Sequence, residues 1–67
     1  MNLTVNDKPM ELQNGSSLRD LLQHLSLGTK RGIAVAVNAE VIAGEDWGNK
    51  QLTENDKIII IRAAQGG

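Results

Sequence analysis

Four consecutive isoleucines at positions 58–61 constrain the fold of this chain more than any other feature. Residues branched at the β-carbon favour strands, and a continuous apolar run is typical of a strand that is covered on both faces. Two glycines, Gly66 and Gly67, come a few residues later. Glycine has no side chain to pack and loses more backbone entropy on ordering than any other residue. The sequence therefore predicts a core strand followed by a thin, flexible segment.

The length of 67 residues allows one small domain with one compact core. The chain has no cysteine, which excludes disulfides and thiolate metal sites. It has a single histidine, His24, which cannot alone make a metal site or a catalytic triad. A net charge of −1 and a single tryptophan argue against a nucleic-acid-binding surface. No apolar stretch approaches the ~20 residues of a membrane span, and the first residues form no signal peptide. We expect a cytoplasmic protein that binds neither nucleic acid nor membrane.

The first thirteen residues have the pattern of a β-hairpin. Apolar and polar residues alternate up to Asn6, and the alternation resumes at Met10. Between them, Asn6-Asp7-Lys8-Pro9 has the composition of a turn, because Asn and Asp bond to nearby backbone and Pro fixes φ.

A helix is predicted over residues 17–26. Ser17 and Asp20 have the spacing of a capping box, in which each side chain binds the backbone of the other. Gly28 lies where helices commonly end with a left-handed residue. His24 lies off the apolar stripe and is interpreted as a solvated helix residue. The stripe itself consists of leucines at helical spacing: Leu18, Leu21, Leu22 and Leu25.

Two further strands are predicted after the helix. In residues 33–38, valine and isoleucine alternate with alanine, and we expect the helix to approach the sheet closely over the small alanines. Val41 and Ile42 form a short second strand, after the turn at Asn38-Ala39-Glu40. Trp47 lies in a glycine-broken region and is interpreted as an anchor of this loop to the core, in preference to a part of a binding surface.

The isoleucine run leaves one question open. If Ile58 and Ile60 point toward the core, Ile59 and Ile61 point to the opposite face of the sheet. One helix of about three turns cannot cover both faces. Ile59 and Ile61 are then either a docking face for a partner protein or are covered by loop residues such as Trp47 or Leu52. The sequence does not decide between these two interpretations.

The predicted elements indicate the α+β class, with a mixed sheet and one main helix packed across one face. The order is hairpin, helix, strand, short strand, irregular loop and last strand. This inventory suits the β-grasp, or ubiquitin-like, fold, although fold alone does not give function. We expect a β-grasp domain over residues 1–64 and a flexible diglycine tail over residues 65–67.

The whole chain also resembles ThiS, the family of sulfur carriers in thiamine biosynthesis. No single element is diagnostic, but their order together with the terminal diglycine is specific. Ala39 is a departure, because many relatives have glycine there. The segments that carry the resemblance are Met1-Asn2-Leu3-Thr4-Val5-Asn6-Asp7, Gly15-Ser16-Ser17-Leu18-Arg19-Asp20-Leu21-Leu22, Val35-Ala36-Val37-Asn38, Glu45-Asp46-Trp47, Asn55-Asp56-Lys57-Ile58 and Gly66-Gly67.

The resemblance implies a carrier rather than an enzyme, with no catalytic residues and no bound cofactor or metal. A ubiquitin-activating-like adenylyltransferase would use ATP to adenylate the carboxylate of Gly67. A sulfur donor, such as a cysteine desulfurase, would convert the adenylate to a thiocarboxylate, and thiazole synthase would take the sulfur. The strand placement of the β-grasp fold, with the first and last strands as central neighbours, is implied in the same way.

The residues are compatible with that chemistry. An α-carboxyl group has a pKa near 3.5, so it is ionised and nucleophilic at neutral pH. The residues Gln65, Gly66 and Gly67 form a narrow segment that could thread into a partner's active site, and an extended chain from Ala63 to Gly67 reaches about 17 Å. Three alternatives remain open: the small subunit of molybdopterin synthase, a protein modifier joined to lysines through Gly67, and an interaction domain whose diglycine is incidental.

Overall fold

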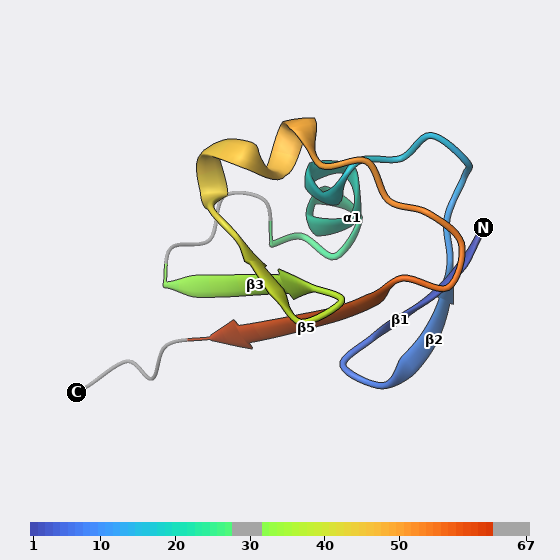
Figure 1. Cartoon of the computed structure of the whole chain (residues 1–67), viewed down its shortest axis with the longest axis horizontal. Helices are drawn as coiled ribbons and strands as arrows, with labels where there is room; N and C mark the ends of the chain where they lie inside the picture. The colour runs from blue at the N-terminus through green and yellow to red at the C-terminus, as the bar shows by residue number, and fades with distance from the viewer. Residues whose placement is uncertain (28–31, 63–67) are drawn as a thin grey trace.

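The computed structural model describes residues 1–27 and 32–62. Five strands form one mixed sheet in the order β2-β1-β5-β3-β4, in which β1 and β5 are parallel central neighbours. This confirms the predicted α+β architecture, with one α-helix lying across one face of the sheet (Figure 1). The elements are β1 (Asn2–Val5), β2 (Lys8–Glu11), α1 (Leu18–His24), β3 (Ile33–Val37), β4 (Glu40–Ile42), the 3₁₀-helix η1 (Gly44–Asn49) and β5 (Lys57–Arg62).

The β1–β2 hairpin closes through a two-residue turn. Asn6 and Asp7 have φ of 52° and 68°, which is typical of the turn whose twist matches the right-handed twist of paired strands. The predicted turn was too long, because Lys8 and Pro9 belong to β2, where Pro9 pairs with Thr4. Since β2 is an edge strand, the missing N–H of Pro9 costs no hydrogen bond within the sheet.

The β3–β4 hairpin uses the same kind of turn at Asn38 and Ala39, whose φ values are 51° and 72°. Asparagine tolerates the left-handed region, but alanine there brings its Cβ close to the following carbonyl oxygen. Ala39 is exposed, so no packing contact offsets this cost. Alanine at position 39 is therefore a source of strain in the turn.

We predict that Ala39→Gly stabilises the protein by about 1 kcal/mol, because glycine adopts this conformation without the steric cost. The melting temperature should rise by about 4–8 °C for a domain of this size. Ala39→Val, which adds branching at Cβ, should lower it. A scan of thermal unfolding for the three proteins measures both shifts, and a lower melting temperature for Ala39→Gly would show that the turn is not strained.

Helix α1 begins with the predicted capping box. The Ser17 backbone N–H donates to the Asp20 carboxylate at 2.9 Å, and the Asp20 N–H donates to the Ser17 hydroxyl at 3.2 Å. The helix ends earlier than predicted, because Ser26 is the left-handed residue, with φ of 61°. The N–H groups of Ser26 and Leu27 donate to the carbonyls of Gln23 and Leu22, an arrangement that usually ends on glycine. Gly28 lies outside the described residues.

The core lies between α1 and the inner face of the sheet. Three leucines of the predicted stripe are fully buried, whereas Leu25, at the end of the helix, is only partly buried. Trp47 packs against this core and its indole N–H donates to the Ile42 carbonyl at 2.9 Å, so its role as an anchor is confirmed. The fully buried members with the largest side chains are Leu18, Leu21, Leu22, Ile58, Val35 and Val37.

The prediction that the helix approaches the sheet over the alanines of β3 was wrong. Val35 and Val37 are buried in the core on the helix side, while Ala34 is exposed and Ala36 is partly exposed on the other face. The larger valines fill the space beneath the leucines of α1, which leaves the small alanines on the outer face. Among the described residues, no helix is long and apolar enough to span a membrane.

Candidate functional site

The central strand β5 presents different isoleucines to its two faces. Ile58 is completely buried and Ile60 packs against the core, whereas Ile61 is 60% exposed and Ile59 is partly exposed. Leu52, one of the residues proposed as a cover, is part of the core cluster on the other side of the sheet. The two outward isoleucines are thus placed as the docking-face interpretation requires.

The strand register extends this surface over three strands. Ile59 lies opposite Ala36 and Ile61 lies opposite Ala34 on β3, and Ala36 is also paired with Val41 on β4. Directly opposite residues share a face of the sheet. Val41 is 74% exposed. We call Ala34, Ala36, Val41, Ile59 and Ile61 the outer apolar face.

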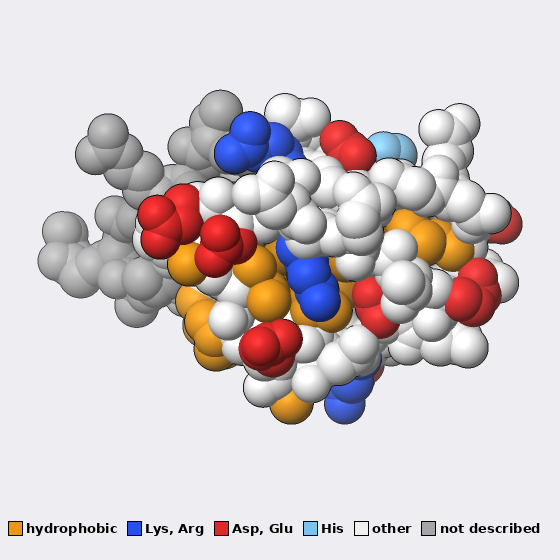
Figure 2. Space-filling model, turned by 45° about the horizontal axis from the view of Figure 1, so that its top comes forward, with side chains coloured by type: hydrophobic (Ala, Val, Ile, Leu, Met, Phe, Trp, Pro, Cys, Tyr) orange, Lys and Arg blue, Asp and Glu red, His pale blue; other side chains and the backbone are white. Residues whose placement is uncertain are grey.

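The outer apolar face has the character of a protein-binding surface. Contiguous exposed apolar side chains on a small domain commonly mark an interaction site. The side of the molecule over η1 and α1 is different, because acidic and basic side chains are interspersed there with small apolar areas (Figure 2). A partner that buries apolar area therefore has its best surface on the sheet around β5.

The end of β5 is held on the β1 side by the side chain of Asn6. The parallel pairing stops at Val5 and Ile58, and the Asn6 N–H donates to the Ile58 carbonyl at 2.9 Å. The Asn6 side-chain oxygen then accepts from the Ile60 N–H at 2.8 Å, and its amide nitrogen donates to the Ile60 carbonyl at 3.3 Å. The Asn6 side chain thus continues the hydrogen bonding between β1 and β5 beyond the last paired residues. The sequence identified Asn6 only as a turn residue.

A second asparagine binds β5 at its beginning. The Asn38 side-chain oxygen accepts from the Lys57 N–H at 2.9 Å, and its amide nitrogen donates to the Asp56 carboxylate at the same distance. Asp56 is only 6% exposed and also accepts from the backbone N–H and the hydroxyl of Thr53. This network fixes the loop that leads into β5.

The ionised form of Asp56 is favoured in the folded protein. Burial, the largest single influence, raises the pKa of this carboxyl group. Hydrogen bonds from Thr53 and Asn38, together with the nearby positive charge of Lys50, act in the opposite direction and together outweigh burial. The pKa of Asp56 therefore lies below its ordinary value.

This lowered pKa predicts a loss of stability in acid. A carboxyl group whose pKa is depressed by folding contributes stability above its unfolded pKa, and this contribution is lost as the pH falls through the folded pKa. We expect Asp56→Asn to reduce the free energy of unfolding at pH 7 by about 1–2 kcal/mol, since it removes the charge from these hydrogen bonds. Below about pH 4 the difference from the original chain should shrink. Urea unfolding of both proteins from pH 7 to pH 2 measures this, and a constant difference across that range would contradict the assignment.

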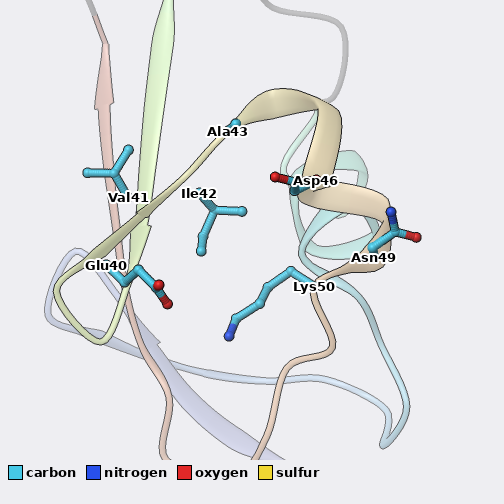
Figure 3. A pocket seen from close by; sticks show the side chains of 7 residues that line it. All are labelled: Glu40, Val41, Ile42, Ala43, Asp46, Asn49 and Lys50. Atoms are coloured by element: carbon cyan, nitrogen blue, oxygen red, sulfur yellow. The ribbon is translucent and has the colours of Figure 1, made fainter.

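A pocket of about 290 Å³ lies between β4 and η1. Glu40 and Lys50 project toward one another across it, and Asp46 and Asn49 line it from η1 (Figure 3). Within the parts of the chain that the structure describes, no group of three or more His, Cys, Asp or Glu side chains could hold a metal ion. The pocket combines charges of both signs around the aliphatic side chains of β4.

Of the remaining predicted site residues, His24 lies within the described part of the chain. It is exposed in the last turn of α1, as expected of a solvated helix residue. Gln65, Gly66 and Gly67 lie outside the described residues, as does the predicted boundary between residues 64 and 65. The structure brings β5 to Arg62, and the predicted threading segment begins three positions later.

Comparisons with known proteins agree on one family. A sequence model of the ThiS family matches residues 3–67. The sulfur carrier protein ThiS of Escherichia coli K12 is 27% identical over 67 residues, with both chains covered completely. The crystal structure of a thiamine biosynthesis protein (ThiS) from Geobacter metallireducens superposes with a TM-score of 0.85 at 28% identity, again over the whole of both chains.

A more distant structure shares the fold. SAMP1 from Haloferax volcanii aligns with a TM-score of 0.65 at 13% identity, over 98% of this chain and 97% of that one. The mixed sheet with one helix is therefore the predicted β-grasp, ubiquitin-like fold.

Proposed function

The chain belongs to the ThiS family, and from this membership we propose that it carries sulfur for the formation of the thiazole ring of thiamine. The family match over residues 3–67 is the observation that carries the proposal, because it includes the C-terminal diglycine as well as the fold. The relative from Escherichia coli is named a sulfur carrier, and the chain matches it from end to end.

The proposed cycle uses the carboxylate of Gly67 as its only reacting group on this chain. A carboxylate oxygen of Gly67 attacks the α-phosphorus of ATP on a ubiquitin-activating-like adenylyltransferase, and pyrophosphate leaves. A persulfide on the sulfur donor, such as a cysteine desulfurase, attacks the acyl carbon and displaces AMP. The product is an acyl disulfide between Gly67 and the donor. A second thiol then attacks the donor's sulfur, which forms a new disulfide with the donor and releases the thiocarboxylate of Gly67. Thiazole synthase takes the sulfur from it.

The outer apolar face is the proposed docking surface for the adenylyltransferase. Ile59 and Ile61 lie on the same strand that leads toward the C-terminal segment, so docking there would bring Gln65, Gly66 and Gly67 toward the partner. The absence of side chains at Gly66 and Gly67 leaves both sides of the reacting carbonyl accessible. ATP is bound by the partner and not by this chain. The need for ATP favours the cytoplasm as the compartment of this cycle.

Growth provides the test of the pathway. Cells that lack this protein should require added thiazole, and a plasmid copy of the full chain should remove that requirement. A plasmid copy that lacks Gly67 should leave the requirement for thiazole in place. Growth of the deletion strain without thiazole, together with inactive molybdenum-cofactor enzymes, would reject the thiazole pathway in favour of molybdopterin synthesis.

A further inference from the structure

Both hairpin turns of the sheet bind the central strand through an asparagine side chain. Asn6 and Asn38 each occupy the first position of a two-residue turn and have nearly the same φ, 52° and 51°. Asn38 bonds to Lys57, where β5 begins, and Asn6 bonds to Ile60, near its end. Each side-chain oxygen thus accepts from a backbone N–H of β5, but the amide nitrogen of Asn6 donates to the Ile60 carbonyl, whereas that of Asn38 donates to the Asp56 carboxylate.

The outgoing end of β5 is paired differently on its two sides. On the β3 side, pairing continues through Ala34 with Ile61 and through Ile33 with Arg62. On the β1 side, the neighbouring strand stops at Val5 and the chain turns away, and the Asn6 side chain makes the hydrogen bonds to β5 that follow. Within residues 1–27 and 32–62, hydrogen bonds therefore hold β5 on both sides as far as Ile60.

We infer that Asn6 is a positioning residue for the delivery of the C-terminal carboxylate. This inference rests on the proposed function, because it supposes that Gly67 must reach a partner's active site. Asn6 holds the backbone of Ile60 and thereby limits the positions and directions from which the following residues leave the domain. Without this contact, the outgoing end of β5 has more conformations, and fewer of them place Gly67 for reaction.

The expected decrease in the rate of adenylation depends on the conformational entropy that is lost when the backbone of Ile60 is ordered. Fixing the backbone of one residue reduces its accessible conformations by a factor of about 5–30. If Asn6 no longer holds Ile60, the pairing with Val35 on β3 still orders part of this backbone, and the rest of the ordering must occur within the complex with the activating enzyme. The expected consequence is a decrease in kcat for adenylation of about five- to tenfold. KM should change little, because the outer apolar face does not include Asn6.

Asn6→Gly and Asn38→Gly form a matched pair for the test. Glycine accepts the positive φ of either turn, so each variant keeps its turn and loses the side-chain amide contacts. Asn6→Gly loses both bonds to Ile60, and Asn38→Gly loses the bond from the Lys57 N–H and the bond to the Asp56 carboxylate. Both variants should be less stable than the original chain. Pyrophosphate exchange with the family's activating enzyme, at a temperature where all three proteins are folded, gives kcat and KM. We expect kcat to fall for Asn6→Gly and to stay within about twofold for Asn38→Gly.

A second measurement reports on the contact itself. Hydrogen exchange of the Ile60 backbone amide should accelerate in Asn6→Gly more than in Asn38→Gly, relative to the amide of Ile58. Asn6→Asp keeps the acceptor for the Ile60 N–H and loses the donor to the Ile60 carbonyl, so its kcat should be intermediate.

The outcomes separate the inference from the proposed function. Equal decreases in kcat for Asn6→Gly and Asn38→Gly would show a general effect of stability and would overturn the positioning role. An unchanged kcat for Asn6→Gly would also overturn the positioning role. An original chain that is not adenylated at all would overturn the proposed function, and with it this inference.

Discussion

Deletion of Gly66 and Gly67 is expected to abolish sulfur transfer and to leave the free energy of unfolding nearly unchanged. The reacting carboxylate would be lost from its position, and the new terminus at Gln65 carries a side chain beside the reacting carbon. Neither glycine has a side chain to bury, so their removal takes no apolar area from the core. Thermal unfolding and thiocarboxylate formation, measured on the same preparation, report the two properties separately.

A matched variant tests the reason for this loss. Gly67→Ala keeps the length of the chain and its terminal carboxylate but adds a methyl group beside the acyl carbon. We expect adenylation of this variant to be much slower than that of the original chain, and its stability to be the same. A large loss of stability on deletion of the two glycines would show that the C-terminal segment is packed on the domain, and the threading argument would then fail.

Ile61→Asp is expected to give a folded protein that is adenylated poorly. Ile61 is 60% exposed, so an aspartate there meets water in the free protein. In the complex, the same carboxylate would lie unpaired within an apolar interface, where burial of a charge is costly. If Ile61 is a hot spot at the centre of this interface, its loss costs about 2 kcal/mol or more, which corresponds to at least about a 30-fold decrease in kcat/KM. We expect this decrease mainly in KM.

Isoleucines of the opposite face are the controls. Ile58 is completely buried, and Ile58→Asp should prevent folding because it places an unpaired charge in the core. Ile60→Asp should also destabilise the domain, since Ile60 packs against the core. Circular dichroism and urea unfolding distinguish the three variants. If Ile61→Asp unfolds, or if it is adenylated as well as the original chain, the outer apolar face is not the docking surface.

Local patterns of the sequence predict most of the fold. Alternation identifies β1 and β3, the isoleucine run identifies β5, leucines at helical spacing identify α1, and Ser17 and Asp20 identify its first turn. These predictions are reliable because each depends on residues that are near one another in the chain. Alternation also shows that β3 has two faces, but it does not show which one the helix covers. Side-chain volume decides this, and Val35 and Val37 fill the space that the alanines would leave empty.

The contacts of β5 with its neighbouring turns could not be predicted in this way. Asn6 is 54 residues from Ile60, and Asn38 is 18 residues from Asp56. Each is an ordinary turn residue by composition, and only the strand order shows that its side chain meets the central strand. The helix end was missed for a local reason, because Ser26 adopts the left-handed conformation that is usual for glycine.

The central claim is that Gly67 carries sulfur, and intact mass tests it most directly. The protein is incubated with ATP, the family's activating enzyme and a sulfur source, and the product is weighed together with a control that lacks ATP. We predict a mass increase equal to the replacement of one oxygen by one sulfur, abolished when Gly67 is deleted. An unchanged mass, or a ladder of larger species joined through lysine, would contradict the claim.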